Sequence, residues 1–283
     1  MSTDAGQLKQ FLKDEGIDLV GVADASSLVL AGPPRPATDL MPTARSVIVM
    51  GVAHSLGAVY SPHIMLWTRN KMETSRLLDR TAEKTARMLE KEGALSLPIS
   101  ADKPVEIFRK DPATGKKLSH TKVLGFLSLK HAAVSCGLGQ IGRSNLLLTP
   151  EFGPHQRLCG IVTEAPLEPD ETVEHDLCIK GCTKCEKACP VGALSGGEYD
   201  VDPCFDYWSY GFDRMPSGIG SIPAYFSMLM KHMKRRDIMV EAGQTFITDV
   251  DHCIECMRAC PVGERWKDIR PEKMRPMRSG GTE

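Results

Sequence analysis

Ten cysteines are spread unevenly along the chain, and eight of them lie between Cys178 and Cys260. They form two motifs: Cys178-x3-Cys182-x2-Cys185-x3-Cys189-Pro190 and Cys253-x2-Cys256-x3-Cys260-Pro261. Both motifs continue as Cys-Pro-Val-Gly. Thiolates at this close spacing, ending in a Cys-Pro pair, are typical of loops that hold cubane iron–sulfur clusters. The spacing therefore predicts two 4Fe–4S clusters, which transfer single electrons.

A count of thiolates assigns four ligands to each cluster. In proteins with two such clusters, the cysteine before proline ligates the other cluster, so the ligands cross over. Cluster one then takes three cysteines of the first motif and one of the second: Cys178, Cys182, Cys185 and Cys260. Cluster two takes the four others of this region: Cys189, Cys204, Cys253 and Cys256. Cys204 is included because it is the only remaining cysteine near either motif.

Two other uses of paired cysteines agree less well with this pattern. Zinc ribbons contain Cys-x2-Cys pairs, but they lack the Cys-Pro ending. A disulfide framework is not expected in a reducing compartment. One feature departs from bacterial ferredoxins, namely the three residues after Cys178 where those proteins have two. Cys178 is therefore the least typical of the eight predicted ligands.

The composition is that of an ordinary globular protein. The 283 residues are 42% hydrophobic and 25% charged, with a formal net charge of −1, so nothing global indicates a polyanionic partner. No apolar run approaches the roughly 18 residues that cross a bilayer, and residues 1–10 lack the features of an export signal. We expect a cytoplasmic protein with no membrane partner.

The elements that must position the two motifs alternate between helices and apolar strands. Helices are expected at 7–15, 73–93 and 128–136, and strands at 17–23, 46–53 and 157–164. This order predicts the α+β fold class. The expected organisation is an α/β body, a ferredoxin-like module with an insertion, and a basic tail: 1–170, 171–268 (insertion 205–250) and 269–283.

The stretch from Ser128 to Asp170 reads SLKHAAVSCGLGQIGRSNLLLTPEFGPHQRLCGIVTEAPLEPD. It resembles the core of the epoxyqueuosine reductase and reductive dehalogenase superfamily, whose hallmarks are a helix, a glycine loop, an LLxT segment and a strand ending in TxxPL. A lone cysteine between the two motifs also matches the family. The resemblance implies a nitroreductase-like body that holds a corrinoid (cobalamin) beside two clusters. The corrinoid is then expected at the glycine loop: Gly137, Leu138, Gly139, Gly142, Arg143, Ser144 and Asn145.

The resemblance implies a cobalamin-dependent reductase that takes electrons from reduced ferredoxin or flavodoxin and reduces a small-molecule substrate. One alternative is an electron-transfer or corrinoid-activating protein, which reduces a partner such as a corrinoid protein and has no substrate of its own. Another is a body that binds a different cofactor such as flavin. We do not expect tRNA as a partner, because the chain ends about twenty residues after Cys260, without the helical repeats that bind tRNA in epoxyqueuosine reductases.

The glycine loop also has the form Gly137-x-Gly139-x-x-Gly142, which occurs at dinucleotide sites. Such a site needs a strand before the loop and a helix after it. The preceding residues, Ala132–Ser135, favour a helix instead. NAD binding at this loop is therefore disfavoured.

Three residues are weak candidates for catalysis: His131, Tyr207 and Tyr210. The tyrosines follow Cys204 closely and could line a substrate pocket or donate a proton, although packing around a cluster is the commoner role of such rings. His131 lies on the helix before the glycine loop and could reach the corrinoid, although most helical histidines are simply hydrogen-bonded. The sequence does not otherwise identify the catalytic residues.

Overall fold

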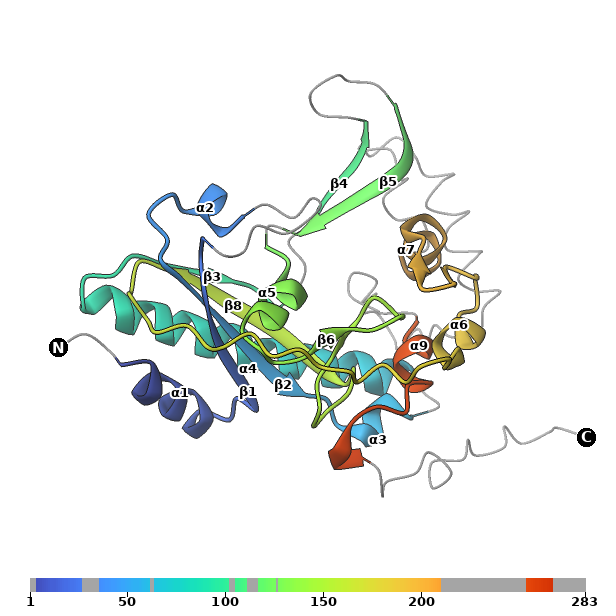
Figure 1. Ribbon diagram of the computed structural model, residues 1–283, viewed down its shortest axis with the longest axis horizontal. Helices are drawn as coiled ribbons and strands as arrows, with labels where there is room; N and C mark the ends of the chain where they lie inside the picture. The colour runs from blue at the N-terminus through green and yellow to red at the C-terminus, as the bar shows by residue number, and fades with distance from the viewer. Residues whose placement is uncertain are drawn as a thin grey trace, which may run out of the picture.

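A four-stranded antiparallel sheet forms the centre of the body in the computed structural model (Figure 1). The structure describes residues 4–26, 36–61, 64–101, 105–110, 117–125, 127–209 and 253–266. The strand order is β1-β2-β8-β3, with bounds Leu19–Asp24, Ser46–Ala53, Gln156–Thr163 and Ser96–Ile99. The two central strands, β2 and β8, are therefore two of the three strands that the sequence predicts.

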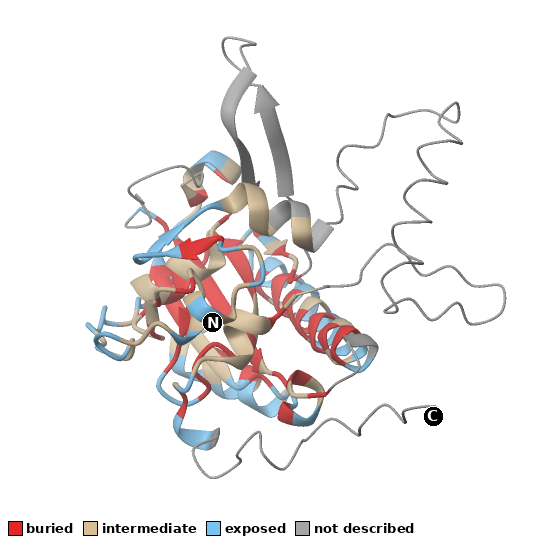
Figure 2. Cartoon of the chain, turned by 90° about the vertical axis from the view of Figure 1, so that its right-hand side faces the viewer, coloured by how far each residue is buried: buried red, intermediate tan, exposed pale blue. Residues whose placement is uncertain are grey.

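Strand β2 shows why the sheet is covered on both sides. Ile48 and Met50 pack with α1 (Ala5–Asp14) and α4 (Ile64–Lys91). The alternate residues Val47 and Val49 pack on the opposite face with α5, Leu129–Ser135. Because successive side chains of a strand point to opposite faces, an unbroken apolar run fits only between two helical layers. The sheet and the inner face of α4 accordingly carry most of the buried residues in Figure 2.

Both helices of the first layer begin or end at residues suited to that place. The carboxylate of Asp4 caps α1 by accepting hydrogen bonds from the amides of Gly6 and Gln7. Gly16 follows α1 with φ 88° and Gly93 follows α4 with φ 92°, a conformation that glycine adopts without strain. These caps fix the lengths of the two helices that cover the sheet.

Shorter elements surround this core. They are α2 (Ala37–Leu40), α3 (Leu56–Val59), the pairs β4–β5 (Val105–Lys110, Lys117–Gly125), β6–β7 (Gln140–Ile141, Leu147–Leu148) and β9–β10 (Leu194–Ser195, Glu198–Tyr199), α6 (Lys184–Ala188), α7 (Val201–Ser209), α9 (Glu255–Arg258) and η2 (Glu264–Trp266). Figure 1 shows α6, α7 and α9 gathered at one end of the sheet. The helices of the two cysteine motifs, α6 and α9, lie side by side there.

The expected α+β class is confirmed, and each expected helix and strand of the body is present to within a few residues, except that α4 begins about nine residues earlier. Strand β3 and the β4–β5 pair are not in the expectation. The tail at 269–283 and most of the predicted insertion lie outside the described residues. No helix among the described residues is long and apolar enough to cross a membrane.

Candidate functional site

The four predicted ligands of cluster one (the cluster-one cysteines) surround one small cavity. Cys178, Cys182 and Cys185 line it from the first motif, and Cys260 lines it from the second. The pKa of Cys260 is raised to about 11, first by burial and then by the neighbouring Cys178, Cys185 and Cys182. The structure thus brings together the four cysteines that the ligand count groups, while their role as ligands stays a prediction.

The four predicted ligands of cluster two (the cluster-two cysteines) are likewise neighbours. The pKa of Cys256 is raised to about 12, first by burial and then by the neighbouring Cys253, Cys204 and Cys189. The pKa of Cys253 is raised by burial first, and also by Cys204 and Cys189. Cys204 therefore lies within electrostatic reach of both cysteines of the second motif, as its assignment to cluster two requires.

The chemistry of the donor set suits iron–sulfur clusters. Among the residues that the structure describes, no group of three or more His, Cys, Asp or Glu side chains is arranged to hold a single metal ion. The cluster-one cavity instead presents four thiols together with the apolar side chains of Leu148, Ile179 and Val262. Thiolates in a largely apolar surround are what a 4Fe–4S cluster takes from a protein.

The first motif is positioned by a linker that is hydrogen-bonded to the body. Asp170 exchanges two hydrogen bonds with the backbone of Val22, both 2.8 Å long. The hydroxyl of Thr172 donates to the carbonyl of Ser135 at 2.9 Å, and Nε2 of His175 donates to the carbonyl of Gly137 at 2.9 Å. Since Cys178 follows three residues later, these bonds set where the motif begins.

Arg258, between Cys256 and Cys260, ties the second motif to the body. Its Nε donates to the carbonyl of Val59 at 2.6 Å, and its Nη2 donates to the carbonyl of Ser61 at 2.9 Å. Val59 is the last residue of α3, and Ser61 lies two residues beyond it. The guanidinium therefore holds α9 at this point of the body.

A second attachment follows Cys260, where two backbones touch directly. The amides of Glu264 and Arg265 donate to the carbonyls of Pro150 and Glu151 at 2.9 and 3.1 Å. A Cβ atom on Gly153 would lie 1.9 Å from the carbonyl oxygen of Val262. Only glycine permits this approach, so Gly153 belongs to the site although the sequence analysis does not include it.

The glycines of the predicted corrinoid loop are explained by packing within the chain. A Cβ on Gly139 would lie 2.0 Å from the carbonyl oxygen of Leu148, and one on Gly142 would lie 2.7 Å from the Leu148 side chain. Gly137 has φ 69° and faces the backbone of Glu171. The glycine pattern therefore needs neither a corrinoid nor a dinucleotide to account for it.

The polar side chains of the loop also have partners within the chain. Arg143 donates through Nε and Nη2 to Oε1 of Glu186 at 3.0 and 2.6 Å. Asn145, at φ 58°, accepts from Nζ of Lys130 through its backbone oxygen at 2.9 Å and its side-chain oxygen at 2.6 Å. Ser144 is buried beside the cluster-one cavity. Leu138 is half-buried and packs against the apolar cluster that contains Val47 and Val49.

The weak catalytic candidates lie on different elements. His131 lies on α5, with Nδ1 at 2.6 Å from Oγ of Ser128. Burial lowers the pKa of His131, and the charge of Lys130 lowers it further. Tyr207 is half-buried on α7, and Tyr210 lies outside the described residues. A catalytic role for any of them stays a prediction.

Tyr199, on β10, is a further residue of the site that the sequence analysis does not include. Burial raises its pKa, and a side-chain hydrogen bond with Cys204 together with the charge of Cys256 raises it further. Its position five residues before Cys204 gives no pattern from which this contact could be inferred. Tyr199 therefore borders the cluster-two cysteines.

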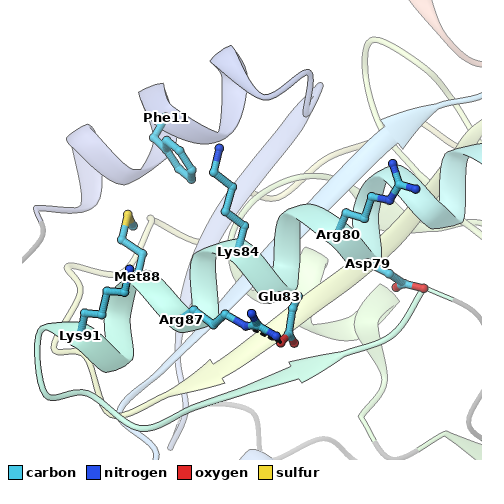
Figure 3. A pocket seen from close by; sticks show the side chains of 8 residues that line it. All are labelled: Phe11, Asp79, Arg80, Glu83, Lys84, Arg87, Met88 and Lys91. Atoms are coloured by element: carbon cyan, nitrogen blue, oxygen red, sulfur yellow. Dashed lines mark hydrogen bonds and ion pairs between the residues drawn. The ribbon is translucent and has the colours of Figure 1, made fainter.

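A separate groove of about 700 Å³ lies between α1 and the outer face of α4 (Figure 3). Its lining is mostly charged and includes the ion pair between Arg87 and Glu83, 2.8 Å long. None of the residues that line it belongs to a cysteine motif or to the glycine loop. This groove is not part of the site.

Comparison with known proteins finds relatives among two groups of reductases. No family model matches the sequence. An epoxyqueuosine reductase of Bacillus cereus is 39% identical over 84 residues, which are 29% of this chain and 22% of that protein. A tetrachloroethene reductive dehalogenase of Sulfurospirillum multivorans is 33% identical over 97 residues, 27% of this chain and 19% of that protein. The homologues of this chain are therefore epoxyqueuosine reductases and reductive dehalogenases. The match spans about a fifth of the length of these curated relatives.

Solved structures of the same two groups share the fold. A reductive dehalogenase described as B12-dependent aligns with a TM-score of 0.53 and 20% identity, over 74% of this chain and 30% of that chain. The epoxyqueuosine reductase of Bacillus subtilis aligns with a TM-score of 0.53 and 19% identity, over 90% of this chain and 64% of that chain. The body is therefore built like the core of both groups of homologues.

The expectation that tRNA is not a partner is wrong. Epoxyqueuosine reductases are homologues of this chain, and one has been solved with an epoxyqueuosine-modified tRNA-Tyr stem loop (TM-score 0.45, 20% identity, 72% of this chain and 56% of that chain). The expectation depended on C-terminal repeats beyond Cys260.

The contact at Gly153 predicts a large effect of a single methyl group. Gly153→Ala should lower the free energy of unfolding by about 3 kcal/mol, because the new Cβ collides with a backbone oxygen that cannot move alone. Gly196→Ala is the matched control, since Gly196 has nearly the same φ, 60° against 57°, but nothing within 4 Å of its Cβ position. It should cost about 1 kcal/mol. If urea unfolding gave the same loss of unfolding free energy for Gly153→Ala and Gly196→Ala, this result would contradict the contact.

Lys130 predicts a pH dependence of stability. Burial lowers the pKa of Lys130 from 10.5 to about 8, so between these values the unfolded chain binds the proton more tightly. Stability relative to a Lys130→Met variant should then rise with pH from 8 to 10.5, by about 1–2 kcal/mol. The Lys130→Arg variant stays charged throughout, so its stability relative to Lys130→Met should show no such rise with pH. A difference in unfolding free energy between wild type and Lys130→Met that stays constant from pH 8 to 10.5 would refute this prediction.

Proposed function

We propose that this chain is an iron–sulfur reductase that passes single electrons through two 4Fe–4S clusters to a corrinoid bound by the body. The convergence of Cys260 with Cys178, Cys182 and Cys185 on one cavity carries the proposal. These cysteines come from motifs far apart in the sequence, and each motif ends in the Cys-Pro pair that zinc ribbons lack. The homologues, reductases of two kinds, support the reductase activity.

The crossed ligand sets also support a relay of electrons. Each predicted cluster takes one cysteine from the motif that supplies most or half of the ligands of the other cluster, and the helices of the two motifs, α6 and α9, are in contact. In the proposal, the protein holds each cluster by thiolates that burial would otherwise keep protonated, as the raised pKa values of Cys256 and Cys260 indicate. Cluster binding then releases their protons.

A corrinoid fits the fold better than it fits the predicted loop. The body shares its fold with a dehalogenase described as B12-dependent. The loop's charged and amide side chains, however, are engaged with Glu186 and Lys130, and half-buried Ile141 remains for contact with a ligand. A bound corrinoid would supply the electrons that reduce the substrate. In the proposal, the chain's own part is to hold it near the clusters by apolar contact.

Two classes of substrate follow from the homologues. One is a small organohalide, as the name tetrachloroethene reductive dehalogenase describes, and the other is an epoxide-bearing nucleoside in tRNA, as in the tRNA complex of an epoxyqueuosine reductase. The same assay with dithionite as reductant tests both, by loss of halide from a chlorinated alkene and by reduction of a modified tRNA stem loop.

Metal content tests the cluster assignment. Anaerobically reconstituted protein should hold about eight iron atoms per chain, and Cys204→Ala should lose or convert one cluster and leave the other intact. Cys159→Ala is the control, because Cys159 is buried in the sheet core, away from the motifs, and should keep the full iron content. EPR of the reduced proteins reports each cluster. Unchanged spectra in Cys204→Ala would show that the ligand partition is wrong, and zinc in place of iron would refute the clusters.

Uptake of a corrinoid tests the rest of the proposal. Addition of hydroxocobalamin to the iron-loaded protein should give one-to-one binding and the visible spectrum of a corrinoid that has lost its lower axial base. Protein with a full iron content that takes up no corrinoid would contradict the reductase proposal and would favour the electron-transfer alternative. The visible titration is run alongside free hydroxocobalamin as the reference spectrum.

A further inference from the structure

Arg143 places a positive charge on the wall of the cluster-one cavity. Among the described residues that line this cavity, it is the single one that carries a permanent charge. It lies in the glycine loop of the body, whereas the cysteines around the cavity belong to the two motifs. The body therefore contributes a cation to a site whose ligands all come from the rest of the chain.

The guanidinium is held in place by Glu186, the residue that follows Cys185. Nε and Nη2 of Arg143 both donate to Oε1 of Glu186, at 3.0 and 2.6 Å. The same oxygen accepts a hydrogen bond from the amide of Gly197 at 3.1 Å. The side chain of Glu186 is 15% exposed and that of Arg143 is 33% exposed, so the pair is ordered and only partly screened by water.

Arg143 is also within electrostatic reach of the thiols themselves. Its pKa is raised by hydrogen bonding and charge from Glu186, and further by Cys178 and Cys185. Ligation makes all four cysteines thiolates, so the cation faces a group with net negative charge. One-electron reduction makes that group one unit more negative, and a nearby cation favours the more negative state.

We propose that Arg143 raises the reduction potential of cluster one, and that Glu186 both orients Arg143 and partly offsets its charge. The proposal rests on the iron–sulfur function proposed above and assigns Arg143 to the cluster, where the family resemblance assigns it to the corrinoid. The electron comes from an external one-electron reductant and stays on the cluster, with no bond made or broken. Arg143 acts as a tuning residue and forms no covalent contact.

Two substitutions that remove charges of opposite sign test the proposal. Arg143→Gln removes a cation, so the ratio of reduced to oxidised cluster one at the wild-type midpoint should fall about tenfold, which equals about 59 mV for a one-electron couple. Glu186→Gln removes an anion and should shift the same midpoint upward. Arg143→Lys keeps the charge and should restore most of the wild-type value. EPR-monitored titration with dithionite measures each midpoint, and Cys204→Ala identifies the signal of cluster two, which should not move.

The ion pair of Arg87 and Glu83 on α4 supplies the matched control (Figure 3). Arg87→Gln and Glu83→Gln break a pair of the same kind far along the chain from the motifs, and both midpoints should stay at the wild-type value. Shifts of equal sign in Arg143→Gln and Glu186→Gln would mean that the pair has only a structural role, and would overturn the proposal. If Arg143→Gln lowered the affinity for a corrinoid and left the midpoint potential of cluster one unchanged, the proposal would also be overturned. Wild-type protein without iron would instead overturn the iron–sulfur function itself.

Discussion

The direct contact between the backbone of Gly153 and that of Val262 and Gly263 is the constraint on which the site depends. A side chain at either glycine would collide with the opposite backbone, since a Cβ on Gly263 would lie 2.9 Å from the amide nitrogen of Gly153. Cys260 lies two residues before this contact, so its position across from the first motif is set by the body and not by its own short helix. The cluster-one cavity is therefore formed by three segments of the chain, namely part of the body and the two cysteine motifs.

The glycine loop has the corresponding role for the first motif. Gly137 lies against the linker and accepts a hydrogen bond from His175, and Arg143 binds Glu186 on α6. Glycines with the spacing of a phosphate-binding loop here serve close packing instead. The loop is thus the surface on which the body receives the cysteine motifs.

The sequence predicts well whatever depends on local pattern. The unbroken apolar run of β2 and the helical spacing of Leu78, Ala82 and Leu89 lead to elements that the structure contains. The grouping of cysteines follows from their count together with the crossing of ligands in proteins with two such clusters. Contacts between distant segments have no such local signal: Gly153 meets Val262 only because the fold brings them together. The partners of Arg143 and Asn145 are lost to sequence reasoning for the same reason. The contact of Tyr199 with Cys204 is local, but a separation of five residues matches no motif.

The two cysteine sets differ in what surrounds them, and this bears on the order of the proposed relay. Arg143, Ser144 and Leu148 of the body border the cluster-one cavity. The described neighbours of the cluster-two cysteines include Tyr199 and Glu255, which belong to the cysteine-rich part itself. An electron on cluster one would therefore be held against the body, beside Arg143. The described charges near cluster two include the carboxylate of Glu255, which is paired with Arg258 at 2.7 Å. Within the proposed function, this asymmetry directs electrons from cluster two toward cluster one and the body.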